Sequence, residues 1–458
     1  MRRDLTNGSV TKNILHMAWP MMVAFTLHVA FNIVDTIFVG RYSALALASI
    51  SITFPVIFLI IALASGIGIG ATSFIARLIG RKKINKAKEV AKHSLLLAFF
   101  MWVFFVAAGL LFAKPLFRYL GAEGDVLSMS LDYAYTIFIG SLFMFFAFIS
   151  NSILRGEGDT KTPMKIMALA TVVNVILDPF LIFGLWIFPR LGVFGAALAT
   201  VIARSISALI VLVYLFKGNA LLKLDFKLPK FDFGIIKEIF EVGIPASLSQ
   251  SVMSLGMFFM MKVVSFFGPY AIAAYGLLGR LDSVAILPAL GIGVAVITIV
   301  GQNVGARKFD RAESTTWKAG LLAAGFMELV GIIFFVVPEF WISIFNKHPD
   351  VVSYGASYLR IVSLTYAFIG LGIVVGAAFQ GAGKGYPSLI LTFVRLFVLS
   401  IPLALIFAFV MDLGIKGVWM GVMVSIVLSS VIGAAWFKTG TWKKGKHIPV
   451  EMAEQLEA

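Results

Sequence analysis

The chain has 458 residues, of which 60% are hydrophobic and only 13% are charged, and its mean hydropathy is +0.97. Soluble domains are about 25% charged, so this composition excludes an ordinary soluble protein and indicates a chain that lies mostly in lipid. The formal net charge of +15 would suit a nucleic-acid-binding protein, but the basic residues lie in loops between apolar runs, and we predict no nucleic-acid partner. The chain has no cysteine, which excludes disulfides and thiolate metal sites.

Twelve apolar runs are long enough to cross a bilayer, because about 20 helical residues at a rise of 1.5 Å span a hydrocarbon core of about 30 Å. Runs such as Phe99–Val106 are apolar on every face, whereas the strands of an outer-membrane barrel alternate. The sequence therefore predicts an all-α integral membrane protein. In chain order the spans cover approximately residues 14–39, 48–75, 91–113, 131–154, 163–186, 191–216, 237–265, 272–300, 317–338, 356–380, 387–410 and 415–437.

The loops between these spans differ in charge. Loops on the side of the amino terminus hold 27 of the 38 lysines and arginines, loops on the other side hold six, and the remaining five lie in the spans or at their edges. This alternation is the positive-inside rule. It predicts a multi-pass protein of the cytoplasmic (inner) membrane with both termini in the cytoplasm, and it makes anionic membrane lipids the expected partner of the basic surplus.

The two halves of the sequence repeat each other at an offset of 225 residues. Trp19-Pro20 matches Ile244-Pro245, and Gly66–Gly68 matches Gly291–Gly293. Six spans per half is an even number, so the halves should be related by an axis along the membrane normal, as in transporters. We predict an N-terminal six-helix lobe at residues 1–217, a cytoplasmic linker at 218–236, a C-terminal six-helix lobe at 237–438 and a cytoplasmic tail at 439–458.

The repeat is broken at two acidic positions inside the spans. The residue that matches Asp35 is Met260, and the residue that matches Asp178 is Ile401. A carboxylate at membrane depth costs at least about 2.5–3.5 kcal/mol. The other lobe folds with apolar residues at the two matching positions. The sequence therefore indicates a functional role for the acids of the N-terminal lobe, although each could also be structural, satisfied by a lysine or a backbone group.

Further polar residues accompany these acids. Asn174 and Asp178 are four residues apart on one helix face, and helical rise places Asp178 about 22 Å from the cytoplasmic end of its span and Thr200 about 13 Å from the outer end of its own. We expect these groups and Asp35 to share one layer. Their oxygens suit a proton or a small hard cation such as Na⁺, and the two carboxylates should exchange a proton as a coupled pair. Thr200 could equally bond to its own helix backbone.

The other intramembrane polar residues carry weaker signals. Lys262, Arg280, Asp282 and Glu328 could line a cavity and meet substrate, or form buried pairs and snorkelling ends. His28 lies two turns before Asp35 and could extend a proton path. Pro20 interrupts the first span and could act as a hinge there.

The chain resembles the multidrug and toxic compound extrusion (MATE) transporters, particularly their DinF-like branch. The resemblance rests jointly on Ala18–Pro20, Asn32–Thr36, Gly80–Ala87, Arg155–Asp159, Asn174–Pro179 and Gly192–Ala197. It implies a V-shaped pair of six-helix bundles that exports amphipathic, often cationic compounds in exchange for protons or sodium. In the DinF-like branch the coupling site lies in the N-terminal lobe, at positions that match Asp35, Asn174, Asp178 and Thr200, and Pro20 matches a bend in the first helix.

Together these observations predict a secondary active multidrug efflux antiporter with H⁺ or Na⁺ as the coupling ion, no cofactor and a monomeric state. The alternative is a flippase of the same superfamily for lipids or polyprenyl-linked substrates, which would need a ring of cavity Arg and Lys side chains that this sequence hardly offers. An enzyme would need clustered acid–base or metal-binding groups, and the five histidines are scattered. We therefore predict that the chain is not an enzyme.

Overall fold

The computed structural model describes residues 4–218 and 220–443. Within these ranges every regular element is helical, and twelve segments are long and apolar enough to cross a membrane. This confirms the predicted all-α class and the predicted number of spans. The predicted tail at 439–458 falls mostly outside the described residues.

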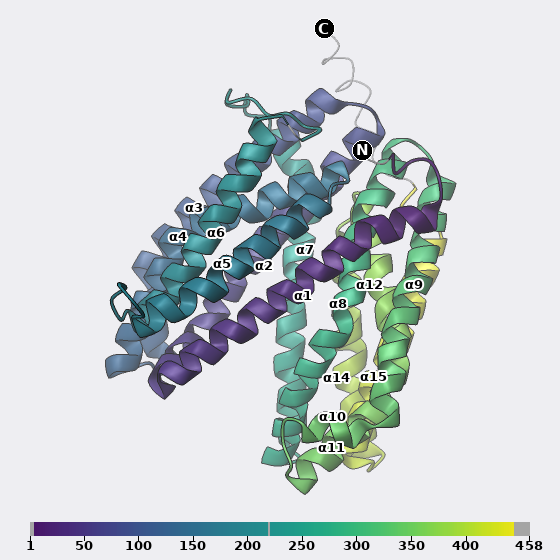
Figure 1. Cartoon of the computed structure of the whole chain (residues 1–458). Coiled ribbons are helices and arrows are strands. Elements are labelled where there is room, and N and C mark those ends of the chain that lie inside the picture. Colours follow the sequence, from purple (N-terminus) through teal and green to yellow (C-terminus); the bar gives the residue numbers. More distant parts are fainter. Residues whose placement is uncertain (1–3, 219, 444–458) are drawn as a thin grey trace. The chain divides into compact units, whose positions relative to one another are not determined.

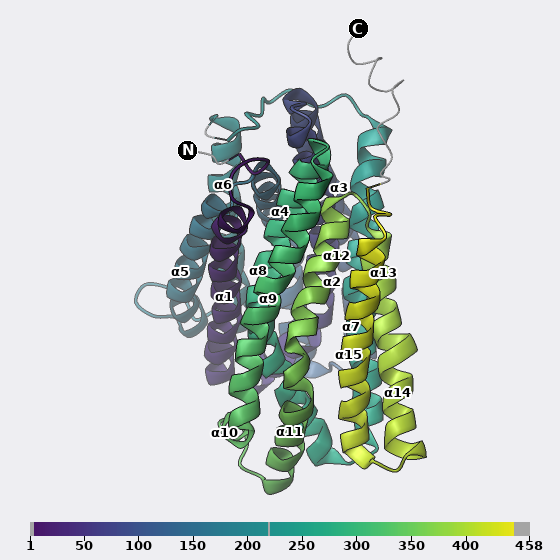
Figure 2. The same ribbon diagram turned by 90° about the vertical axis from the view of Figure 1, so that its right-hand side faces the viewer.

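The helices of the first half are α1 (Val10–Tyr42), α2 (Ala44–Gly80), α3 (Ile84–Tyr119), α4 (Gly124–Glu157), α5 (Lys161–Phe183) and α6 (Gly192–Phe216). The second half holds α7 (Phe233–Ser265), α8 (Pro269–Gly305), α9 (Phe309–Val336), α10 (Pro338–Ser343), α11 (Pro349–Val362), α12 (Tyr366–Gly381), α13 (Tyr386–Phe393), α14 (Ile401–Leu405) and α15 (Gly414–Lys438). In the first half α3, α4, α5 and α6 run side by side (Figure 1), and in the second half α9, α12 and α15 do so (Figure 2).

Most helices are longer than the apolar runs that predicted them. The third span was expected from residue 91, but α3 begins at Ile84, because its charged first turns are good helix formers that need no lipid. The fifth span ends earlier than expected, at Phe183 instead of 186. Gly184 adopts a left-handed conformation with φ 71° and its N–H bonds to the carbonyl of Phe180, which closes the helix.

Two spans of the second half are not single α-helices. The tenth consists of α11 and α12, joined by a 3₁₀ turn at Ser363–Thr365. The eleventh consists of α13 and α14 with π-helical stretches at Val394–Ser400 and Ile406–Val410. Such breaks free backbone groups inside a membrane, where they need side-chain partners.

The chain folds into two compact units that do not end where the halves of the repeat end. Unit 1 contains Leu15–Ser247, and unit 2 contains Asp4–Ile14 together with the described residues from Leu248 onward. From Asp4 the described chain therefore runs in unit 2 and enters unit 1 within α1, and its second half begins in unit 1 and enters unit 2 within α7. In each half of the repeat, the first described residues therefore belong to the unit formed mainly by the other half. The two halves of the repeat share this feature.

The amino-terminal piece is fastened to unit 2 by hydrogen bonds from basic side chains. Lys308 donates to the carbonyl oxygen of Thr6 (2.9 Å) and to Oδ1 of Asn7 (2.8 Å), and Arg311 donates to the carbonyl oxygens of Asn7 (2.7 Å) and Gly8 (2.8 Å). The side chain of Leu5 is buried. These bonds fix the direction in which the chain enters α1.

The start of α7 is fastened to unit 1 by an ion pair and by close helix packing. Arg77 Nη2 and Glu238 Oε2 lie 3.2 Å apart, and the hydroxyl of Ser247 donates a 3.1 Å hydrogen bond to the carbonyl oxygen of Ala62. A Cβ atom added at Gly70 would lie 2.2 Å from the carbonyl oxygen of Ile239. Gly66 and Gly70 therefore let α2 and α7 touch backbone to backbone, as small residues do in membrane helices.

Candidate ion-coupling site

Three neighbouring helices of unit 1 bring Asp35, Asp178 and Thr200 into one layer. An apolar cluster that includes Val39, Ile182 and Ala196 packs around the same helices. Val39 lies four positions after Asp35, Ile182 four positions after Asp178 and Ala196 four positions before Thr200. Each pair is therefore about one helical turn of 5.4 Å apart and on the same helix face. Because the cluster members touch one another, the polar residues one turn away must also lie at a common level, with the apolar cluster covering them on the predicted outer side.

The fifth helix contributes an amide to this layer. Asn174 and Asp178 are both fully buried, and Asn174 Nδ2 donates a hydrogen bond of 3.1 Å to Asp178 Oδ1. The i, i+4 spacing on α5 creates this contact directly. Thr200 on α6 is also buried, and Asp35 on α1 is partly buried.

Three oxygens of the layer are buried without a hydrogen-bond partner among the described residues: Asp35 Oδ1, Asn174 Oδ1 and Asp178 Oδ2. A buried acceptor without a donor costs about 1–3 kcal/mol, and more when it is charged. None of the three acceptor oxygens has a donor among the described residues. A proton or a cation bound in the layer would supply the missing partner.

Tyr133 also belongs to this layer, and the sequence analysis did not single it out. Its side chain on α4 is buried, and its phenol lies within electrostatic range of both Asp35 and Asp178. The two carboxylates also interact with each other. The phenol is a hydroxyl that can donate to an ionised carboxylate. A tyrosine in an apolar run is too common to signal such a role, and its distance along the chain from both acids hides it.

A buried cation lies on the inner side of the layer. Arg204 is one turn from Thr200 on α6, and its guanidinium sits 5.2 Å from the ring centroid of Phe31. The ring of His28 also stacks on the ring of Phe31, with ring centroids 6.3 Å apart. The ring of Phe31 therefore contacts two basic side chains, one of which, His28, was expected to extend a proton path. That path remains a prediction.

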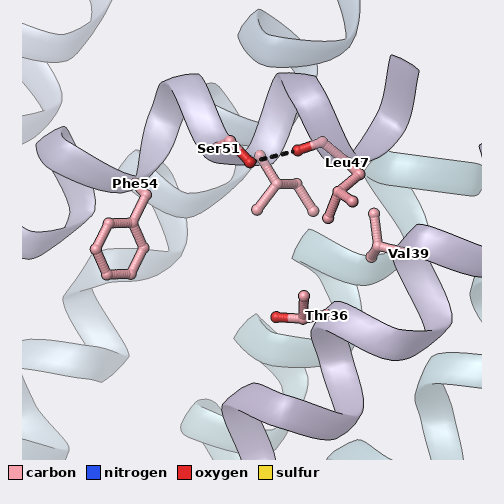
Figure 3. Close-up of a pocket in the computed structure, with 6 residues that line it drawn as sticks. Thr36, Val39, Leu47, Ser51 and Phe54 are labelled. Carbon is pink, nitrogen blue, oxygen red and sulfur yellow. Dashed lines mark hydrogen bonds between the residues drawn. The ribbon is translucent and has the colours of Figure 1, made fainter. Parts of the chain in front are cut away.

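A small cavity of about 240 Å³ adjoins the layer between the outer parts of α1 and α2. Figure 3 shows Thr36 and Val39 of α1 facing Leu47 and Ser51 of α2, with Phe54 further along. The hydroxyl of Ser51 is occupied by a 2.8 Å bond to the carbonyl oxygen of Leu47. The cavity lies beside Thr36, the neighbour of Asp35 in the sequence of α1.

Pro20 lies inside α1, and the helix continues on both sides of it. Its side chain is buried in unit 1, six residues beyond the point at which α1 passes from unit 2 to unit 1. A proline removes one helical hydrogen bond and so allows bending at low cost. The position suits the predicted hinge within α1, which stays a prediction.

The four polar residues named in the second half have separate surroundings. Asp282 on α8 accepts hydrogen bonds from the phenols of Tyr358 (2.7 Å) and Tyr366. Glu328 on α9 accepts a 3.0 Å bond from the backbone N–H of Ala367.

Ala367 is in the first turn of α12, directly after the 3₁₀ break, so Glu328 satisfies a backbone group that the break exposes. Lys262 and Arg280 are exposed, and the ammonium of Lys262 lies over the ring of Phe266 at 5.3 Å. Both acids are thus hydrogen-bonded within unit 2, whereas those of unit 1 retain free oxygens. A role for any of these four residues in a substrate cavity stays untested.

The described residues contain no group of three or more His, Cys, Asp or Glu side chains that could hold a metal ion. A sodium site of the predicted kind would use the amide and hydroxyl oxygens of Asn174 and Thr200 as well as the carboxylates. Such a mixed set holds a weakly bound, exchangeable ion better than a permanent metal.

Comparison with known proteins identifies the family. A family model described as MatE matches residues 20–180 and 245–406. The two matches cover most of the chain and fall one in each half of the repeat. The chain belongs to the MATE family. This confirms the resemblance, while membership of the DinF-like branch stays a prediction.

Individual MATE relatives match over nearly their full length. The chain is 29% identical over 454 residues, 98% of its own length, to the probable multidrug resistance protein NorM of Thermotoga maritima, of which it covers 96%. It is 29% identical to the FAD transporter of Shewanella oneidensis, covering 94% of this chain and 95% of that one. The solved structure of a MOP superfamily transporter from Pyrococcus furiosus matches with a TM-score of 0.89 and 31% identity, covering 96% and 98% of the two chains. These relatives are membrane transport proteins, and this MATE chain is accordingly a multi-pass membrane transporter.

Proposed function

We propose that this protein is a secondary active antiporter of the cytoplasmic membrane, which exports amphipathic, cationic compounds in exchange for H⁺ or Na⁺. The observation that carries the proposal is the layer of Asp35, Asn174, Asp178 and Thr200 in unit 1, where one oxygen each of Asp35, Asn174 and Asp178 is buried without a hydrogen-bond partner among the described residues. The relatives named as multidrug resistance proteins support the substrate class. The protein acts as a monomer, with both termini in the cytoplasm.

The layer couples ion and substrate through its charge. With Asp35 and Asp178 ionised, the layer attracts a cationic substrate. A proton or Na⁺ that arrives from outside neutralises the layer, removes this attraction and favours the state that releases the substrate. An ion can shift two conformations only by the difference in its affinity for them, and a tenfold difference corresponds to about 1.4 kcal/mol.

The relatives do not all carry one substrate class, because one of them is named a FAD transporter. A flavin nucleotide is an anion, so family membership by itself does not select a cation. The negative layer is the feature of this chain that favours one. No observation in the structure favours the flippase alternative.

The proposal is tested with purified protein in liposomes. Efflux of ethidium is driven by an imposed pH gradient or by a sodium gradient, and wild type is compared with Asp35→Asn and Asp178→Asn. Asp132→Asn serves as a matched control, because Asp132 is an exposed carboxylate on α4 of the same unit.

We expect wild type and the control to move the dye, both site variants to fold but lose gradient-driven transport, and the effective gradient to name the ion. Site variants that transport as fast as wild type would show that the buried acids are structural. If no gradient moves any dye through wild type, the cationic substrate class is wrong and flavin nucleotides and lipids are the next substrates to assay.

A further inference from the structure

The segment that joins α6 to α7 exposes large apolar side chains although it lies outside the membrane-spanning helices. Phe226, Leu228, Phe231 and Phe233 are 88%, 85%, 68% and 70% exposed. On the helices, exposed side chains of this kind face lipid. A water-exposed linker has no such cover, and clustered exposed apolar residues on a soluble surface mark an interaction site.

Other side chains of the linker, and not these four, are buried against the protein. Ala220, Leu222 and Leu224 alternate along the first part of the linker and are buried against unit 1. The linker therefore has buried apolar contacts with the protein besides the four exposed side chains.

The contacts of the linker hold it level with the helix ends. Glu157, the last residue of α4, accepts hydrogen bonds from the backbone N–H groups of Leu221 (2.9 Å) and Leu222 (3.0 Å). The ring of Phe226 stacks on that of Phe216, the last residue of α6, with centroids 4.6 Å apart. The apolar runs predicted for the fourth and sixth spans end at residues 154 and 216, and α4 and α6 end at Glu157 and Phe216. The contacts therefore hold the linker close to the ends of these apolar runs, where the headgroups of a bilayer are expected.

The charges around the exposed apolar residues are positive. Lys217, Lys223, Lys227 and Lys230 are exposed and alternate with the aromatic positions. The two acids of the segment are already engaged within the protein. Asp225 pairs with Lys92 at 2.8 Å, and this hydrogen bond holds the pKa of the Asp225 carboxyl below its ordinary value.

The second acid, Asp232, accepts hydrogen bonds from the backbone N–H groups of Gly234 (2.8 Å) and Ile235 (3.3 Å) in the first turn of α7. It therefore acts as a cap of α7 and contributes little free negative charge to the surface. Of the four lysines, Lys227 has Asp225 within electrostatic range. Four lysines against two engaged acids leave the segment with a net positive charge.

We propose that residues 223–233 form an interfacial anchor, in which the exposed aromatic and leucine side chains enter the headgroup region and the lysines bind anionic phospholipid headgroups. Aromatic side chains prefer this depth of a bilayer, and lysines near it are attracted to anionic lipids. The anchor is separate from the ion-coupling layer and does not depend on the proposed transport activity. The anchor would attach the linker between α6 and α7 to the bilayer surface.

The absence of cysteine from the natural sequence makes the test direct. Single variants Phe231→Cys and Leu228→Cys are spin-labelled and placed in nanodiscs, and each leaves the other three apolar residues intact. Asp310→Cys is the control, because Asp310 is an exposed residue at the start of α9. The accessibility of each label to oxygen and to a water-soluble nickel chelate is measured in discs of phosphatidylcholine alone and in discs that also contain phosphatidylglycerol.

We expect the labels at 228 and 231 to be at least about threefold less accessible to nickel than the label at 310 in phosphatidylglycerol discs, and clearly more accessible when the anionic lipid is left out. The triple variant Lys223→Gln, Lys227→Gln, Lys230→Gln should lose this dependence on lipid charge. Labels that are open to nickel in both kinds of disc would overturn the anchor. Labels that are buried equally in both, with or without the lysines, would overturn the recognition of anionic headgroups.

Discussion

The seam between α2 and α7 offers a sharp test of how the start of the second half is held on unit 1. An alanine at position 70 would place its Cβ 2.2 Å from the carbonyl oxygen of Ile239, and one at position 66 would place it 2.5 Å from that of Gly243. At position 70 the obstacle is main-chain oxygen, which cannot rotate away as a side chain would, and at position 66 the Oγ of Ser247, 1.8 Å from the added Cβ, stands in the way as well. One helix must therefore move.

The size of the effect follows from this distance. A carbon and a carbonyl oxygen in contact across packed helices lie about 3.3–3.6 Å apart, so α7 would have to move by roughly 1 Å relative to α2. Forcing one extra carbon into a packed interior costs about 1–3 kcal/mol. An alanine that meets no obstacle would instead gain about 0.5–1 kcal/mol over glycine inside a helix.

The assay is thermal unfolding of Gly70→Ala in detergent. Gly325→Ala is the matched control, because Gly325 is also inside a long helix but a Cβ there meets nothing within 4 Å. We expect Gly70→Ala to melt several degrees below wild type and Gly325→Ala to melt at or above it. Equal melting of the two variants would refute the backbone-to-backbone seam.

Two further predictions concern the carboxylates that the structure shows as satisfied. Replacing both Tyr358 and Tyr366 by Phe removes the phenol donors of Asp282 and should destabilise the protein by about 1–3 kcal/mol per lost bond; thermal melting measures this, adding Asp282→Asn should recover part of the loss, and an unchanged melting temperature would contradict the assignment. Hydrogen bonds from Thr6 hold the pKa of Asp4 below its ordinary 3.8, so the ionised carboxylate stabilises the amino-terminal segment above that pH, and the contribution is lost as the pH falls through the lower folded pKa. Hydrogen exchange of residues 4–9 should show more protection in wild type than in Asp4→Asn at about pH 6, and the difference should shrink and vanish as the pH falls from 3.8 through the lower folded pKa; a difference that grows in acid would contradict this sign.

Much of the candidate site could be named before the structure. The costs of burying Asp35 and Asp178 are so large that their positions in apolar runs signal function, and the i, i+4 spacing on one helix brings Asn174 to Asp178 without any tertiary information. Helical rise also predicted a depth for each residue. These inferences need only local geometry.

Tyr133 and Arg204 show what local geometry misses. Both gain their significance from neighbours on other helices, Tyr133 from the two carboxylates and Arg204 from Phe31. The spacing along the chain contains no trace of these contacts. Asp282 and Glu328 are the reverse case: the sequence shows two deep acids, and only the structure supplies the phenols and the backbone N–H that satisfy them.

The sequence by itself determined the number of membrane spans, the helical class and the division into two repeated halves, because hydropathy, helix length and self-similarity are properties of contiguous residues. Only the tertiary structure decided that the starts of α1 and α7 exchange between the compact units. It also decided that the tenth and eleventh spans are broken and that the linker is held along the helix ends. These features depend on which distant side chain or backbone group fills a given space, and packing of that kind is a property of the folded chain as a whole.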